Sequence, residues 1–119
     1  MLNQIVLVGR LTHDIEIIKN EDGKKYANLK IAVPRSFKNS EGVYETDFFD
    51  CIAFESIAEN TASYCQKGDI IGIKGRMQSK LKETKSGEKF NMINVITEKV
   101  TFLSSRSNEK SKSDQEQER

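Results

Sequence analysis

The order of strand-like and helix-like segments is the feature that most constrains what this chain can fold into. In residues 26–33 apolar side chains recur at every second position, which is the period of a strand with one buried face. Residues 57–66 instead repeat their apolar side chains at helical spacing. We therefore predict one short helix, with three strands before it and two after it. The predicted strands are residues 3–13, 26–33, 46–54, 69–82 and 90–103.

Turn-forming residues predict where these segments end. Residues 14–20 continue the first extended segment, and Asp22-Gly23 predicts the hairpin turn after it. Pro34 is expected to end the second strand, so that residues 35–45 form a long polar loop. Further expected features are a bend at Gly9, a hairpin turn at 83–89 and a bend near 97–99.

The single helix carries a signal at each end. Ser56 and Glu59 have the spacing of a capping box, in which each side chain bonds the backbone N–H at the other's position. Lys67-Gly68 predicts the stop, because glycine readily adopts the left-handed conformation that ends a helix.

A helix between the third and fourth strands of a five-stranded meander is the layout of an OB-fold barrel, a scaffold for binding oligonucleotides and oligosaccharides. We predict an all-β fold of this kind. Residues 104–119 contain no hydrophobic residue, so the core must come from residues 1–103. The expected organisation is therefore an OB-fold domain at 1–103 and a disordered polar C-terminal tail at 104–119.

Composition excludes several classes of protein. No run of about 20 apolar residues exists to span a membrane. Arg10, His13 and Asp14 interrupt the N-terminal apolar run, which argues against a signal peptide. Two cysteines are too few for a disulfide scaffold, so we expect a reduced, cytoplasmic protein associated with the nucleoid and not with a membrane.

Catalysis has little support in the sequence. His13 is the only imidazole, and Cys51 and Cys65 have no second histidine with which to form a zinc site. The glycines of residues 68–75 are not followed by the Gly-Lys-Ser/Thr of a phosphate-binding loop. We expect no enzyme activity, no metal and no cofactor.

Basic residues gather on one face of the strand at 69–82. Because side chains alternate along a strand, Ile71 and Ile73 point to one face and Lys74, Arg76, Lys80 and Lys82 point to the other. Residues 74–89 hold six basic residues and two acidic ones. A solvated hairpin would show the same pattern, so this row alone does not distinguish ligand binding from solubility.

The placement of phenylalanines favours binding. Phe37 lies in the expected polar loop between Arg35 and Lys38, where no periodic apolar face can bury it. Phe48 and Phe54 share one face of their strand, and Phe49 lies on the other. A small barrel has one interior, so one set must meet solvent, a partner subunit or a ligand. Exposed phenylalanine beside cations suits stacking on nucleic-acid bases.

These residues resemble the bacterial single-stranded DNA-binding protein family over residues 1–103. The matching segments are NQIVLVGRL at 3–11, IAV at 31–33 leading into Phe37, TDF at 46–48, FESIAE at 54–59, YCQKG at 64–68 and GRMQ at 75–78. The resemblance implies an OB-fold, a homotetramer and sequence-independent binding of single-stranded DNA in replication, recombination and repair. It also implies base stacking by Phe37, Phe48 and Phe54, and phosphate contacts by Arg10, Arg35, Arg76 and Lys80.

Two departures from the family pattern change what is expected. Lys82 stands where relatives usually carry Trp or Tyr, so one stacking platform is expected to be lost. The tail lacks an acidic tip ending in apolar residues, so recruitment of replication or repair proteins is not expected. This favours a paralogue or a mobile-element version of the family.

Two other functions fit the same fold. The first is a primosome-type adaptor that acts mainly through protein contacts, against which the three retained phenylalanines argue. The second is an RNA- or sugar-binding OB domain, because selective contacts to a 2′-hydroxyl are not visible in a sequence.

Overall fold

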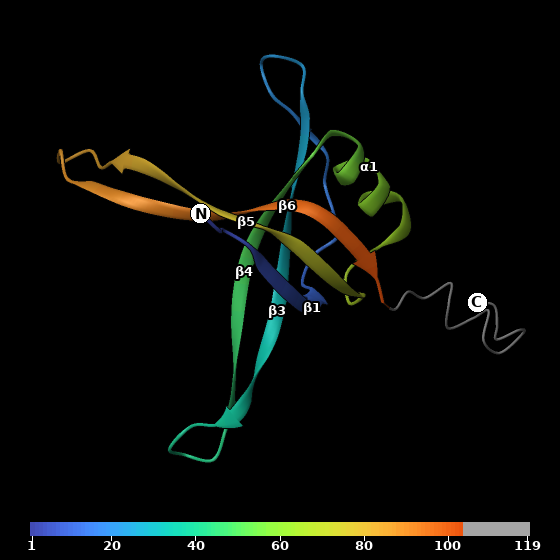
Figure 1. Cartoon of the computed structure of the whole chain (residues 1–119), viewed down its shortest axis with the longest axis vertical. Coiled ribbons are helices and arrows are strands. Elements are labelled where there is room, and N and C mark those ends of the chain that lie inside the picture. Colours follow the sequence, from blue (N-terminus) through green and yellow to red (C-terminus); the bar gives the residue numbers. More distant parts are fainter. Residues whose placement is uncertain (104–119) are drawn as a thin grey trace, which may run out of the picture.

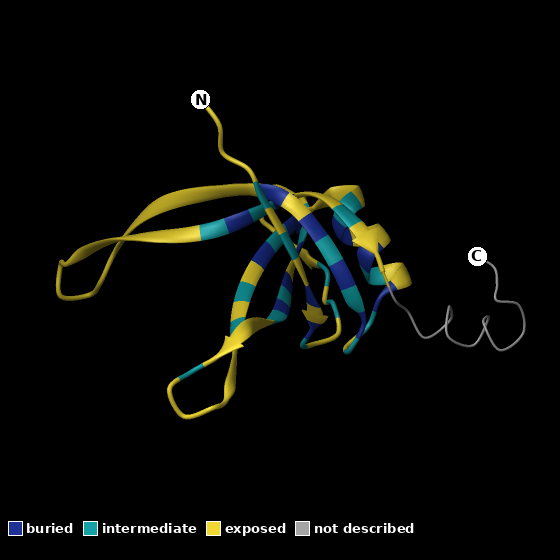
Figure 2. Ribbon diagram, turned by 60° about the horizontal axis from the view of Figure 1, so that its bottom comes forward, coloured by how far each residue is buried: buried dark blue, intermediate teal, exposed yellow. Residues whose placement is uncertain are grey.

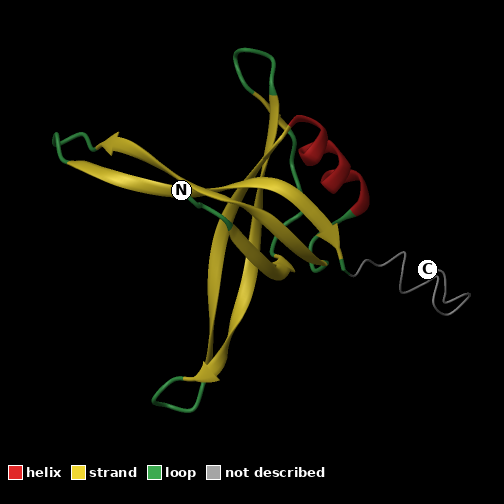
Figure 3. Cartoon of the chain, in the orientation of Figure 1, coloured by secondary structure: helices red, strands yellow, loops and turns green. Residues whose placement is uncertain are grey.

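The sheet closes into a barrel because its first strand pairs with two neighbours. The computed structural model describes residues 1–103, and the predicted tail lies outside them. Their elements are β1 (Ile5–Leu11), β2 (Ile18–Lys19), β3 (Lys25–Lys38), β4 (Tyr44–Phe54), α1 (Glu55–Tyr64), β5 (Ile70–Glu83) and β6 (Lys89–Phe102) (Figures 1 and 3). β1 pairs antiparallel with β5 and then, at Arg10 and Leu11, with β3. This confirms the predicted five-stranded OB-fold barrel, to which β2 adds a two-residue strand beside β3.

Two glycines allow strands to approach closely where the barrel curves. A Cβ at Gly9 would lie 2.7 Å from the carbonyl oxygen of Ala32, and one at Gly75 would collide with the carbonyl oxygen of Ile96. Beside Gly75 the β5–β6 register shifts, which leaves Glu98 without a cross-strand partner in that ladder. This bulge confirms the bend predicted near 97–99, since an extra residue in one strand bends it.

The core consists of the inward positions of the alternating strands. Its largest buried side chains come from β3 and β5, and α1 covers one side of the barrel with Ala58 and Thr61. The fully buried larger members are Leu29, Ile31, Cys51, Thr61, Ile71 and Ile73. Period-two alternation therefore predicted the buried face correctly.

Pro34 does not end the second strand, and most of the predicted loop at 35–45 is strand. β3 continues to Lys38 and pairs there with Tyr44 of β4. The register shifts between Pro34 and Lys38, and such an irregularity accommodates a residue that has no N–H to donate. The connecting loop is confined to residues 39–43.

The helix begins and ends two residues earlier than predicted, and the capping box does not form. β4 runs directly into α1, with Phe54 as an N-cap that makes no side-chain hydrogen bond. Ser56 therefore lies inside the helix, not before it. At the other end Cys65 is already extended, and Gly68 instead takes its positive φ of 96° in the turn before β5.

Two hairpin arms extend beyond the barrel. In Figure 1 the β5–β6 arm runs to the left and the β3–β4 arm runs downward. Beyond Gly75 every residue of β5 is exposed, as Figure 2 shows for both strands of that arm towards its tip. Within residues 1–103 the one helix, α1, is too short and too polar to cross a bilayer.

The two cysteines are core residues and form no disulfide. Burial, reinforced by Asp50, raises the pKa of Cys51 to about 12, and burial with a smaller effect of Asp69 raises that of Cys65 to about 11. Both thiols are therefore neutral at physiological pH and unsuited to act as nucleophiles. No cluster of metal-ligating side chains occurs in the described part of the chain.

Candidate nucleic-acid interface

β4 turns two phenylalanines away from the core. Its inward positions hold Phe49, Cys51 and Ala53, and the alternate positions hold Phe48 and Phe54, which are 62% and 41% exposed. This placement confirms that Phe48 and Phe54 share one face of the strand and Phe49 lies on the other. The side of the sheet that carries Phe48 and Phe54 is called the outer face below.

Register places Arg10 on the outer face with Phe48. Arg10 of β1 pairs with Ala32 of β3, which pairs in turn with Phe48 of β4. Neighbouring strands are ~4.8 Å apart, so the two backbones lie ~10 Å from each other. A hollow of about 340 Å³ on this face is lined by Val8, Gly9, Arg10, Ala32, Pro34, Thr46 and Ile70. The Nη1 group of Arg10 donates a 2.7 Å hydrogen bond to the Gly68 carbonyl oxygen, which fixes its position.

A second row of neighbours joins the outer face to the basic strand. Arg76 of β5 pairs with Ile96 of β6, and Ile96 pairs with Ile52, which lies between Phe48 and Phe54 on β4. Arg76 is held by a 3.0 Å hydrogen bond to Gln78 and lies 3.8 Å from a carboxylate oxygen of Glu98. The phenylalanines and the basic row are therefore two parts of one surface.

The predicted basic row follows this surface outward along β5. Lys74, Lys80 and Lys82 share the face of Arg76 and make no ion pair with any residue of the described chain. All three side chains are exposed and accessible to an anionic ligand. An extended strand of phosphates suits such a row better than a single anion does.

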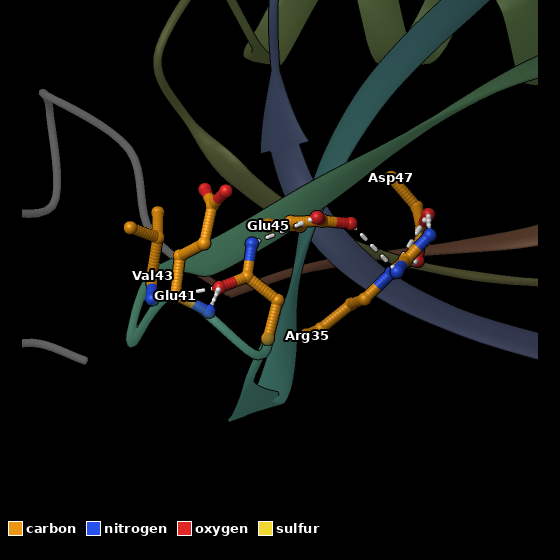
Figure 4. A network of polar contacts seen from close by, with 6 residues as sticks. Arg35, Glu41, Val43, Glu45 and Asp47 are labelled. Carbon is orange, nitrogen blue, oxygen red and sulfur yellow. Dashed lines mark hydrogen bonds and ion pairs between the residues drawn. The ribbon is translucent and has the colours of Figure 1, made fainter.

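Arg35 is not brought together with these residues. Its guanidinium donates to Asp47 at 2.9–3.2 Å and to Glu45 at 2.8 Å (Figure 4). The hydrogen bonds that Arg35 donates to Asp47 lower the pKa of the Asp47 carboxyl group and raise the pKa of Arg35. Asp47 directly precedes Phe48 on β4, so its side chain points to the opposite side of the strand. Arg35, which binds Asp47, therefore lies on the side of the β3–β4 arm away from Phe48. Two carboxylates already neutralise this cation.

Phe37 and Lys38 lie near the tip of the β3–β4 arm. Phe37 is exposed, as expected for a residue with no apolar face to bury it. The ammonium group of Lys38 lies over the ring of Tyr44, 5.6 Å from its centre. Lys38 pairs with Tyr44, which alternation along β4 places on the same side as Phe48, so the strand register ties Lys38 to the outer face near the tip of the arm.

Sequence reasoning missed three apolar residues on the outer face. Tyr26 pairs with Phe54, and their ring centres are 6.4 Å apart. Phe90 and Met92 of β6 lie opposite Lys82 and Lys80. The hairpin register could have identified Phe90 and Met92. Pairing the residues on either side of the turn at 83–89 one by one places these two side chains on the basic face.

Comparison with known proteins gives one consistent answer. The model of the single-strand binding protein family matches residues 2–103. Single-stranded DNA-binding protein B of Bacillus subtilis (strain 168) is 40% identical over 110 residues, which cover 92% of this chain and 97% of that protein. The single-stranded DNA-binding protein of Halalkalibacterium halodurans is 41% identical over 106 residues, which cover 89% and 63%.

A solved structure shows the same fold. The chain in a structure titled as a Plasmodium falciparum SSB complex with ssDNA superposes with a TM-score of 0.75. The superposition covers 87% of this chain and 96% of that one, at 21% sequence identity. At this identity the likeness concerns the fold alone, and it agrees with the barrel described above.

Proposed function

The chain belongs to the single-strand binding protein family, and on that premise we propose that it binds and protects exposed single-stranded DNA through the outer face. One observation carries the assignment of the surface. Phe48 and Phe54 are exposed on the same sheet face as Arg10 and Arg76. Stacking rings combined with phosphate-binding cations form the usual groove for single strands.

This combination explains binding without sequence preference. Every base offers a π-face to an exposed ring, and every nucleotide offers a phosphate to a cation. The binding serves replication, recombination and repair, in which single strands are exposed, and it takes place in the cytoplasm at the nucleoid. We assign no catalytic step to it: the one imidazole of the sequence, that of His13, contacts the Thr12 hydroxyl at 2.6 Å.

The decisive experiment is a titration of the protein with unstructured oligonucleotides at two salt concentrations. We expect oligo(dT) to bind tightly and duplex DNA of the same length to bind at least an order of magnitude more weakly. Equal affinity for duplex would contradict the proposal, because paired bases cannot stack on protein rings. A parallel titration with oligo(U) reports whether the protein also binds RNA.

Lys82 is expected to contribute a phosphate contact. Each phosphate neutralised on a single strand steepens the slope of log K against log [salt] by about 0.7, so Lys82→Gln should flatten the slope by that amount. Lys89→Gln is the matched control, since it removes the same charge from the opposite side of the same arm. The measurement is oligo(dT) affinity at several salt concentrations. An unchanged slope in Lys82→Gln would show that Lys82 does not touch the strand.

We also propose that the chain assembles as a homotetramer. Phe48 and Phe54 are apolar side chains exposed outside the core. On β1, Val6 and Val8 are also exposed and point away from the core. Over residues 5–9 one edge of β1 has no strand partner within the described chain. An exposed apolar strand with a free edge is a site where another chain can pair or pack.

Val8→Glu is expected to break this assembly. It places a charge on the exposed side of β1, the part of the outer face that we assign to subunit contact, where burying an unpaired carboxylate is costly. The control is Val43→Glu, because Val43 in the β3–β4 loop is similarly exposed (53% against 51%). Sedimentation at micromolar concentration should show a smaller species for Val8→Glu alone, and a wild-type monomer would refute the homotetramer.

Recruitment of other proteins remains a prediction. The expectation that the tail recruits no replication or repair protein concerns residues 104–119, which lie outside the described residues.

A further inference from the structure

The side chain of Asn3 makes two hydrogen bonds to the backbone of one residue at the root of the β5–β6 arm. Its Nδ2 group donates to the carbonyl oxygen of Met77 at 2.7 Å, and its Oδ1 atom accepts from the N–H of Met77 at 2.9 Å. The two residues are 74 positions apart in the chain. Because one amide side chain pairs with both polar groups of one backbone residue, the bonds fix an orientation as well as a distance.

Asn3 occupies the next position of the β1–β5 ladder after its last backbone pair. That antiparallel ladder ends at Ile5 and Gly75, and counting two residues further on each strand in the same register places Asn3 opposite Met77. The chain before β1 runs away from the barrel (Figure 2). The Asn3 side chain therefore supplies the donor and the acceptor that the backbone of a longer β1 would supply.

The arm leaves the barrel at Met77 and Val95, which lie opposite each other. On the β6 side, Val95 is held by its parallel pairing with Cys51 of β4. On the β5 side packing gives little support, because Gly75 has no side chain and Met77 is 42% exposed. Within residues 1–103, β6 is the only strand that pairs with β5 beyond Gly75. The two bonds of Asn3 are therefore the polar contacts that tie the β5 side of the arm to the barrel.

Fixing the β5 side sets the direction of the arm. A two-stranded ribbon that is attached through one strand can turn about that strand, whereas attachment of both strands at the same level prevents the turn. Lys80 and Lys82 lie three and five residues beyond Met77, which is about 10 and 17 Å along an extended strand. A small turn at Met77 would therefore move both ammonium groups by several ångströms, out of the line that begins at Arg76.

We propose that Asn3 is a positioning residue for DNA binding, which holds the arm so that Lys80 and Lys82 continue the surface formed by Phe48 and Arg76. Asn3 acts through the direction of the arm and not through a contact with the DNA. A row of cations that is already aligned loses less conformational freedom on binding than a row on a turning arm does. This inference rests on the proposed function and adds to it a residue that precedes the first strand.

Hydrogen exchange of the free protein tests whether Asn3 holds the arm. Asn3→Ala removes both bonds to Met77, and Asn3 is exposed, so the substitution leaves no cavity. Amides of the arm at residues 78–82 and 90–94 should exchange about 5- to 30-fold faster, the change expected for the loss of one to two net hydrogen bonds. Amides of the barrel should keep their wild-type rates.

The matched control is Asn20→Ala, in the turn before β3. The Asn20 side chain accepts a 2.9 Å hydrogen bond from the backbone N–H of Lys24, so this variant removes the same kind of exposed bond away from the arm. Its arm amides should exchange as those of the wild type do. Unchanged arm exchange in Asn3→Ala would overturn the proposal, as would equally faster arm exchange in both variants.

A double-variant cycle with a long oligo(dT) tests whether the arm's direction matters for binding. Asn3→Ala should weaken binding and flatten the slope of log K against log [salt] by about 0.7 to 1.4, the contribution of one to two phosphates. Lys82→Gln should then change the slope much less in the Asn3→Ala protein than in the wild type, because the arm no longer presents Lys82 to the strand. Additive effects would overturn the positioning role, since an independent structural role leaves the contribution of Lys82 intact.

The outcomes separate this inference from the function on which it rests. If the wild type binds oligo(dT) and Asn3→Ala binds it with the same affinity and slope, the positioning role fails and the proposed function stands. If the wild type does not bind oligo(dT), the proposed function fails and the positioning role fails with it, whatever the exchange rates are.

Discussion

Phe48→Ala and Phe54→Ala are each expected to weaken binding of single-stranded DNA by about 1–3 kcal/mol, the usual contribution of one stacked base. Both rings are exposed, so their removal leaves no cavity in the core and should not change the fold. Phe37→Ala belongs to the same series and is expected to fall in the same range. The measurement is oligo(dT) affinity at fixed salt, with circular dichroism and sedimentation to confirm that fold and assembly are kept.

Tyr64→Ala is the control for this series. Tyr64 is an exposed aromatic residue at the end of α1, where its ring contacts Phe102 and not the outer face. Its loss should leave affinity unchanged within about 0.5 kcal/mol, as is usual for surface substitutions. The stacking assignment would be wrong if all three phenylalanine variants bound as the control does.

Leu29→Ala is expected to cost about 2–5 kcal/mol in the free energy of unfolding, because deleting a buried side chain loses transfer free energy and leaves a cavity. Leu29 is fully buried in β3 and lies opposite Cys51 on the inner side of the barrel. The measurement is chemical denaturation at one fixed subunit concentration, since unfolding of an oligomer depends on concentration.

The control for Leu29→Ala is Val43→Ala, at an exposed position in the β3–β4 loop. It should change stability by less than about 0.5 kcal/mol. A loss below about 1 kcal/mol in Leu29→Ala would mean that the site collapses to fill the space, contrary to the close-packed barrel core described here.

The sequence predicts well which side chains of each strand are buried, because the two-residue periodicity of the strand itself determines this. Leu29 and Ile31 alternate with Asn28 and Lys30, and the structure buries the first pair and leaves the second on the outer side. The split between Phe49 and the phenylalanines on either side of it follows from the same rule. The helix was also predictable, because its spacing differs from that of the strands around it.

What the sequence did not predict depends on neighbours distant in the chain. Pro34 was expected to end its strand, but pairing with β4 and a local register shift carry β3 through it. The phosphate contact predicted for Arg35 stays a prediction, but the sequence did not predict that two carboxylates of the facing strand bind its guanidinium. The face of Phe90 depends on the register of the β5–β6 turn, which local composition does not specify.

The arms differ from the barrel in how firmly they are held. Past Met77 the β5–β6 arm has no buried side chain, and a two-stranded ribbon that buries no hydrophobic face is marginal by itself. Its amide hydrogens should therefore exchange with solvent well before those of the barrel, through local openings that leave the core intact. A nucleic-acid strand that lies across both parts then dissociates in stages. On the proposed DNA-binding surface we therefore expect nucleotides on the arm to detach first while those on β4 stay bound, so that the strand end becomes accessible to other proteins before the complex has come apart.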